Sequence, residues 1–164
     1  MYARILPQSF PYRSTALTLR LWDALRTVRP DPERARAAVR AQDGNRAAWE
    51  AEMRAIFGKT ADTVIAAELA QFHKNDPARH AARLENIVRG WPQIVQIARE
   101  ELPDTDDTIA LMRELGMATT PGDLGISRED TRRALIGSRE IRDKYITSSL
   151  LWDLGLLREM AETL

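Results

Sequence analysis

The chain has 164 residues, 44% hydrophobic and 29% charged, a balance typical of a globular protein with a core. Its 24 basic residues equal its 24 acidic residues, so it lacks the basic excess of most nucleic-acid-binding proteins. It contains no cysteine, which excludes disulfides and cysteine-ligated metal sites, and no apolar run approaches the roughly 20 residues that span a bilayer, so we expect a cytoplasmic protein.

Apolar residues recur at helical spacing along nearly the whole chain, which predicts helices and no strand. The aspartate–proline pair at 31–32 indicates a helix start, because the carboxylate caps free backbone N–H groups and proline fits the first helical turn. This helix is expected to run to about Ala41. Two further helices are expected, one that ends at Gly58 and one that covers residues 61–72. The face of the first helix is formed by Leu17, Leu21, Leu25 and Val28.

A second aspartate–proline pair, at 76–77, repeats the signal for a helix start. We expect Gly90 to end that helix, because glycine commonly follows the last helical residue. The strongly periodic residues 91–102 then predict a separate helix, which Pro103 closes.

The acidic cluster Asp104, Asp106 and Asp107 lies at the start of the next predicted helix. Paired carboxylates can serve as catalytic acid and base. Their position at the positive end of the helix dipole favours capping instead. The expected inner face of this helix is Ile109, Met112 and Leu115.

Residues 116–126 form the one long irregular stretch, after which Ser127 and Asp130 resemble a capping box. Two short helices with leucines at 150–154 and 156–157 end the chain. The helix after the irregular stretch is expected to present Ala134, Leu135, Ser138 and Ile141. The predicted fold class is therefore all-α, a multi-helix bundle, with residues 14–164 as a single domain.

No glycine-rich turn of the kind that binds a dinucleotide is present, so we expect no cofactor site in this chain. The two histidines, His73 and His80, lie on either side of the helix break at 76–77. With Glu68 or Glu85 they could form a weak metal site, but a metal site needs three or four convergent ligands. We interpret them as exposed polar residues at a helix junction.

Residues 124–135 look like a helix-turn-helix segment, and Arg128, Arg132 and Arg139 could reach phosphates. Acidic residues on the same helix and the neutral net charge argue against DNA binding. The four tryptophans fall at or beside apolar helix positions, and we interpret them as core residues.

Three segments of the chain resemble bacterial sn-glycerol-1-phosphate dehydrogenases, relatives of iron-containing alcohol dehydrogenases and dehydroquinate synthases. They are residues 76–84 (DPARHAARL) with Trp91, residues 119–126 (TTPGDLGI), and residues 141–157 (IRDKYITSSLLWDLGLL). Residues 14–21 (STALTLRL) are similar to the helix that follows a metal-binding His-Gly in that family. The resemblance covers about residues 14–164 and implies the carboxy-terminal half of the dehydroquinate synthase-like fold.

In that family an amino-terminal Rossmann-like half binds NAD(P), and one Asp and two His hold zinc or nickel. The enzyme reduces dihydroxyacetone phosphate; the metal polarises the carbonyl and the cofactor supplies hydride. We expect no such half in this chain, and residues 7–11 (PQSFP) stand where the second His is expected. No catalytic, cofactor-binding or metal-binding residue of the family can therefore be assigned, and residues 1–13 are interpreted as a segment unlike the family.

The sequence thus predicts a carboxy-terminal fragment or split component of such a dehydrogenase, inactive alone. Its expected partner is a separate chain with the Rossmann half, or a second copy of itself, without membrane or nucleic acid. The alternatives are a non-enzymatic helical interaction domain and a helix-turn-helix DNA-binding protein. Any surface that still lines a substrate cleft is expected at residues 116–126 and at Arg142, Asp143 and Tyr145. We also expect Arg142 and Asp143 to form a surface pair, and the Tyr145 hydroxyl to face water.

Overall fold

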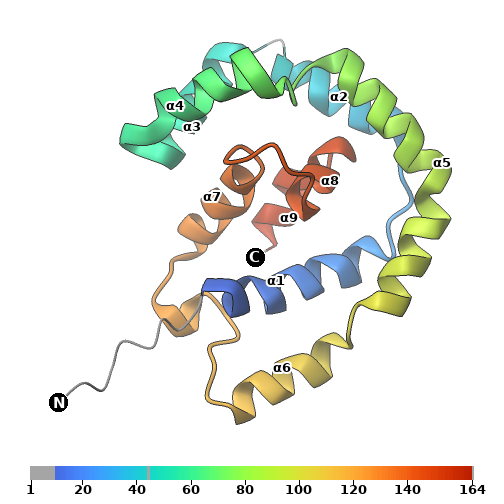
Figure 1. The fold of residues 1–164 in the computed structure, drawn as a ribbon, viewed down its shortest axis with the longest axis vertical. Coiled ribbons are helices and arrows are strands. Elements are labelled where there is room, and N and C mark those ends of the chain that lie inside the picture. The colour runs from blue at the N-terminus through green and yellow to red at the C-terminus, as the bar shows by residue number, and fades with distance from the viewer. Residues whose placement is uncertain (1–9, 44, 164) are drawn as a thin grey trace. The chain divides into compact units, whose positions relative to one another are not determined.

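The computed structural model describes residues 10–43 and 45–163, and this part of the chain is all-α, without a strand (Figure 1). No helix in it is long and apolar enough to cross a membrane. Residues 1–9, with most of the positions where the family's second His was sought, lie outside the described residues. The α-helices are α1 (Phe10–Leu25), α2 (Pro32–Asp43), α3 (Arg46–Phe57), α4 (Ala61–Ala67), α5 (Pro77–Glu101), α6 (Thr105–Glu114), α7 (Arg128–Ser138), α8 (Thr147–Asp153) and α9 (Leu157–Glu162).

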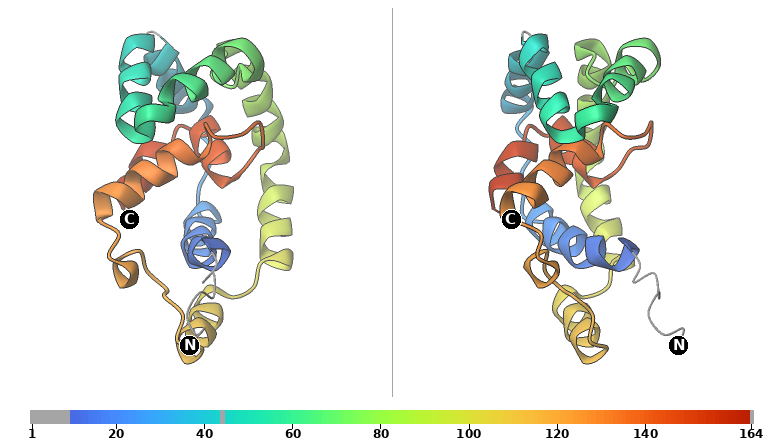
Figure 2. Two further views of the ribbon diagram at one scale, coloured as in Figure 1. Left: turned by 60° about the vertical axis from the view of Figure 1, so that its left-hand side comes forward. Right: turned by 90° about the vertical axis from the view of Figure 1, so that its left-hand side faces the viewer.

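The chain forms two compact units, and the division passes through α5 between Trp91 and Pro92. The first unit contains α1, the second part of α5, and α6 (Figure 2). Its core joins Ala16 of α1 to Ile109 and Met112 of α6. The guanidinium of Arg26, just after α1, donates a hydrogen bond of 3.0 Å to the backbone carbonyl of Ala98 in α5.

The second unit contains α2 to α4, the first part of α5, and α7 to α9. Helices α3 and α4 lie side by side (Figure 1), and their core consists of Trp49, Met53, Ala61 and Ile65. Two glycines permit close helix contacts. A Cβ on Gly137 of α7 would lie 2.8 Å from Ile56 Cγ2, and one on Gly155 would lie 3.0 Å from the Ala35 Cα.

The predicted helix starts at aspartate are confirmed by backbone hydrogen bonds. Asp31 accepts from the N–H groups of Glu33 and Arg34 ahead of α2, and Asp76 accepts from that of Arg79 in α5. In the acidic cluster, Asp104 accepts from the Asp107 N–H at 2.9 Å, so capping is the correct interpretation of Asp104. These starts were predictable because each cap and its partner lie within three residues.

The prediction that Gly90 ends a helix is wrong, because α5 continues through Gly90 and Pro92 to Glu101. Glycine costs about 1 kcal/mol and proline about 3 kcal/mol relative to alanine inside a helix. Burial of one large apolar side chain contributes about 1.5–3 kcal/mol, and several along this helix outweigh that cost. The buried positions keep their helical spacing on both sides of Gly90 and Pro92: Leu84, Ile87, Trp91, Val95 and Ala98.

Three expected inner-face residues, Leu115, Ala134 and Ile141, are instead exposed. Leu115 is 67% exposed because α6 ends at Glu114, and Ile141 is 57% exposed because α7 ends at Ser138 rather than continuing past residue 141. The Ser138 hydroxyl donates to the Leu135 carbonyl and meets the Ser148 hydroxyl at 2.7 Å. Residues 139–146 therefore form a loop between α7 and α8.

Candidate functional site

A π-helical turn, η2 (Glu68–Phe72), follows α4 and sets the position of one acidic side chain. The wider turn shifts the helical phase, and Glu68 is 3% exposed while the neighbouring Leu69 is 38% exposed. The turn ends at His73, which has a left-handed backbone with φ of 50°. The Glu68 Oε1 accepts a hydrogen bond of 2.7 Å from the backbone N–H of Asn75, immediately beyond it.

Arg83 of α5 and Asp153 of α8 form the best-defined ion pair of the second unit. The Arg83 Nε and Nη2 donate three hydrogen bonds of 2.9–3.2 Å to the Asp153 carboxylate, which is 1% exposed. The Tyr145 hydroxyl donates to the same carboxylate at 2.9 Å. The buried His80 Nε2 donates to the Asp153 backbone carbonyl at 2.9 Å. One residue of α8 is thus held by α5 on both its backbone and its side chain.

A second ion pair lies at the end of α7, where Arg139 and Glu140 are 3% and 2% exposed. Arg139 Nη1 donates to Glu140 Oε1 at 2.5 Å and to Asn75 Oδ1 at 2.7 Å. The Arg139 guanidinium carbon lies 4.1 Å from the centre of the Trp152 ring, within cation–π distance. Lys74 donates to the Arg139 and Arg142 carbonyls.

Together these residues form an ionic cluster with three cations and three carboxylates. Such a balance is needed because an unpaired buried charge is strongly destabilising. Hydrogen bonding is nevertheless incomplete, since the Glu68 Oε2, Arg139 Nε and Glu140 Oε2 atoms are buried without a hydrogen-bond partner. The members of the ionic cluster are Glu68, Lys74, Arg83, Arg139, Glu140 and Asp153.

Burial controls the electrostatics of this cluster. It raises the pKa of Glu68, and the nearby Glu140 charge adds to that effect. It lowers the pKa of Lys74 and of Arg139. Burial also acts to lower the pKa of Arg83, but the hydrogen bond and charge of Asp153 outweigh it and raise that pKa. The Tyr145 pKa is raised, first by burial of the hydroxyl and then by the Asp153 charge.

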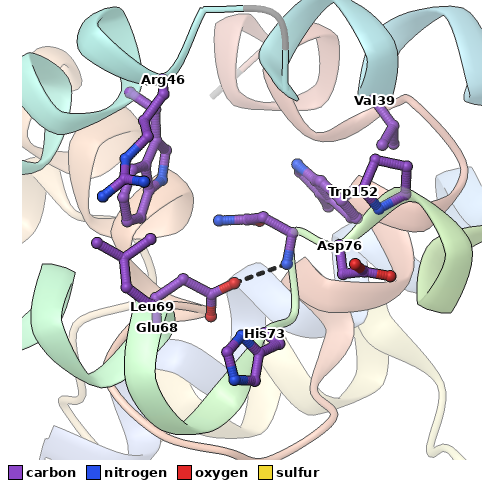
Figure 3. Close-up of a pocket in the computed structure, with 10 residues that line it drawn as sticks. Val39, Arg46, Glu68, Leu69, His73, Asp76 and Trp152 are labelled. Atoms are coloured by element: carbon purple, nitrogen blue, oxygen red, sulfur yellow. Dashed lines mark hydrogen bonds between the residues drawn. The ribbon is translucent and has the colours of Figure 1, made fainter.

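One cavity, of about 230 Å³, lies beside the cluster and is lined by two tryptophans (Figure 3). Figure 3 shows Glu68 and Trp152 on opposite sides of it, with the Glu68 hydrogen bond dashed. The Trp49 Nε1 atom is buried without a partner, as is Glu68 Oε2. Trp49 and Glu68 thus both line this tryptophan cavity, and each has one buried polar atom without a hydrogen-bond partner.

A second cavity, of about 290 Å³, is lined by five cationic side chains, and we call it the basic cavity. Phe72, His73, Tyr145 and Ser149 are also in its wall. The charged residues that line it are Lys74, Arg79, Arg83, Arg139 and Lys144, opposed by Asp143 and Asp153. Its wall holds more cationic side chains than that of the tryptophan cavity.

The interpretation of both histidines as exposed is wrong for His80, which is 1% exposed and packs edge-on against Trp152 at 5.3 Å. His73 is exposed, as expected. Within residues 10–43 and 45–163, no group of three or more His, Asp or Glu side chains could hold a metal ion.

The Tyr145 hydroxyl donates to buried Asp153, while the residue as a whole is 55% exposed. Arg142 and Asp143 are both exposed, and Asp143, like Tyr145, lines the basic cavity. Residues 116–126 belong to the other unit. There, the Asp123 carboxylate accepts from the backbone N–H groups of Thr119 and Thr120, which lowers its pKa.

The arginines proposed to reach phosphates in DNA are largely engaged elsewhere. Arg139 is buried in the ionic cluster, so the expectation that it could reach a phosphate is wrong. Arg132 pairs with Glu129, and this contact lowers the pKa of Glu129 to about 2. Trp49, Trp91 and Trp152 are buried, as expected of core residues, and Trp22 is partly buried.

Sequence analysis missed Glu68, Glu140 and Asp153 as members of one site. A signal existed for Asp153, which interrupts the otherwise apolar run at 150–157. A charge inside such a run needs a partner if it is buried. No local signal identified Arg83 as that partner, because it lies seventy positions earlier in the chain.

Comparisons with models of known protein families, with curated proteins and with solved structures find no match to this chain.

Proposed function

We propose that residues 14–164 serve as the helical part of an enzyme similar to sn-glycerol-1-phosphate dehydrogenases. In this proposal a nucleotide-binding domain that these residues do not supply carries NAD(P) and the metal. The helical part completes that enzyme and has no turnover by itself. The proposal rests on the resemblance of residues 76–84 and 141–157 to that family.

One structural observation supports it: these two segments meet in space. His80 and Arg83 from the first segment both bond to Asp153 of the second, and Tyr145 of the second bonds to the same carboxylate. The two segments that carry the resemblance therefore contact each other within the second unit.

The chemistry available in the chain is consistent with a supporting role. The dehydrogenase reaction needs a hydride donor and a Lewis acid at the substrate carbonyl. The sequence has no glycine-rich dinucleotide turn, and its described residues gather no metal-ligand group. We therefore derive no catalytic step from these residues.

The test is NAD(P)H-dependent reduction of dihydroxyacetone phosphate with zinc or nickel added. The purified chain is assayed alone and after co-expression with the nucleotide-binding half of a bacterial sn-glycerol-1-phosphate dehydrogenase. We expect no turnover alone, and co-purification with turnover for the pair. Asp153→Asn should abolish reconstitution, while the exposed control Asp62→Asn should retain it.

Turnover by the chain alone would contradict the division of roles, because the chain would then hold its own cofactor and metal. A folded chain that neither co-purifies nor restores turnover would contradict the enzymatic role. That second result would favour the alternative of a non-enzymatic helical interaction domain. The exposed apolar side chains Ile141 and Ile146, between α7 and α8, are the observation that favours this alternative.

A further inference from the structure

The basic cavity has a surplus of positive charge that the rest of the chain does not share. Five cationic side chains line it against two carboxylates, although the whole chain carries equal numbers of basic and acidic residues. Arg83 is bound to Asp153 and Arg139 to Glu140, so the cations of the wall without a carboxylate at hydrogen-bond distance are Lys74, Arg79 and Lys144.

Two of these cations have no carboxylate partner in the described part of the chain. The Lys144 ammonium makes no hydrogen bond or ion pair there, and the Arg79 side chain donates only to the Phe72 carbonyl at 3.0 Å. Both side chains are exposed at the cavity and need no rearrangement of the core to meet a ligand.

Two deeper cations of the wall belong to the ionic cluster. Arg139 is 3% exposed and is paired with Glu140, and its Nε atom is buried without a hydrogen-bond partner. Lys74 donates to backbone carbonyls and lies 4.0 Å from the Glu140 carboxylate. Burial lowers the Lys74 pKa, and a bound anion would raise it again by stabilising the charged amine.

We propose that the basic cavity is a binding site for a phosphate group, with Arg79 and Lys144 as the outer contacts and Lys74 as the inner one. Phosphate fits this wall better than a carboxylate does, because it offers three oxygens and up to two charges to several cations at once. A cavity of about 290 Å³ also leaves room for a small organic group attached to the phosphate. This inference stands apart from the proposed enzymatic role, because it concerns the chain alone.

The experiment is an NMR titration of the full chain with inorganic phosphate, at constant ionic strength maintained with chloride. We expect saturable shifts of the backbone amides of Lys74, Lys144 and Ser149. The double variant Arg79→Gln with Lys144→Gln should bind about tenfold more weakly, since hydrogen bonds to charged groups are the stronger ones.

The matched control is Arg40→Gln with Lys59→Gln, which removes the same charge from exposed positions away from the cavity. Equal weakening in both double variants would show general charge attraction and overturn the proposal. Shifts that do not saturate, or that map elsewhere, would overturn it too. If the first variant is unfolded by circular dichroism, a phosphate-specific rise in the wild-type Tm, absent with chloride, provides the test.

A parallel titration with methyl phosphate identifies the source of the group. Tighter binding of methyl phosphate than of inorganic phosphate indicates a phosphate ester. The reverse order indicates the free anion. Both orders support the site, and absence of binding by both ligands removes it.

Discussion

Arg83 holds the carboxylate of Asp153, seventy positions later in the chain, through three hydrogen bonds of 2.9–3.2 Å. Asp153 is 1% exposed, while the Arg83 side chain is 28% exposed. The acid is therefore fully removed from water and depends on its partner. This pair links α5 to α8 within the second unit.

Replacing Asp153 by Asn should reduce the free energy of unfolding by about 3 kcal/mol, the lower end for a broken buried pair because Arg83 keeps some solvent. Urea denaturation followed by circular dichroism measures this change. Asp62→Asn, at a side chain that is 88% exposed, should change it by less than about 0.5 kcal/mol. A similarly small loss at Asp153 would show that the pair contributes little.

Gly155 and Gly90 should respond in opposite directions to alanine. Gly155 has φ of 70°, and a new Cβ would lie 3.0 Å from the Ala35 Cα, so Gly155→Ala should destabilise by about 1–3 kcal/mol. Gly90 is inside α5 with nothing within 4 Å of a new Cβ, so Gly90→Ala should stabilise by about 1 kcal/mol. Thermal unfolding distinguishes the two signs, and a loss of stability in Gly90→Ala would contradict α5 as a continuous helix.

Glu68 makes the stability depend on pH. Its folded-state pKa is raised above 4.5, so the protonated acid contributes stability that is fully present below that pH and lost as the pH rises through the folded-state value. Glu68→Gln mimics the protonated acid and keeps an acceptor for Asn75. It should therefore match wild type near pH 4 and become the more stable protein by about pH 7.5, in urea denaturation at both values. A variant less stable than wild type at the higher pH would show that the charged form is preferred.

Tyr145 should ionise only above the range of an ordinary phenol. Burial and the Asp153 charge raise its pKa above 10.0, so its contribution to stability is present below that pH and lost as the pH rises further. Tyr145→Phe should also cost about 1 kcal/mol by removing one hydrogen bond. The phenolate absorbance of Tyr145, taken as wild type minus variant, gives its titration. Titration near pH 10 in the folded protein would contradict the bond to Asp153.

Local sequence signals predicted much of the helical structure. Helix starts at Asp31, Asp76 and Asp104 and the helix end at Gly58 depend on hydrogen bonds within a few residues, and all were predictable. The continuation of α5 through Gly90 was not predictable in this way, because burial of apolar side chains along the helix outweighs the tendency of a single glycine to end a helix.

The ionic cluster could not be assembled from the sequence. Apart from the adjacent Arg139 and Glu140, the cluster's contacts include pairs of residues 65 and 70 positions apart, and such separations leave no periodic signal in the sequence. The burial of Glu68 depends in addition on a π-helical turn, which no residue pattern in 61–72 indicated. The charge in the apolar run at 150–157 was the one available hint.

The π-helical turn at Glu68–Phe72 makes the polar interior depend on the number of residues in one helix. A π-turn is equivalent to an α-helix with one residue inserted. Loss of a single codon within 69–72 would let the helix return to ordinary α geometry, and Asn75 would be drawn back by one position relative to Glu68. Chain length at this point, rather than the identity of any side chain, therefore determines whether the acid and its N–H donor can meet.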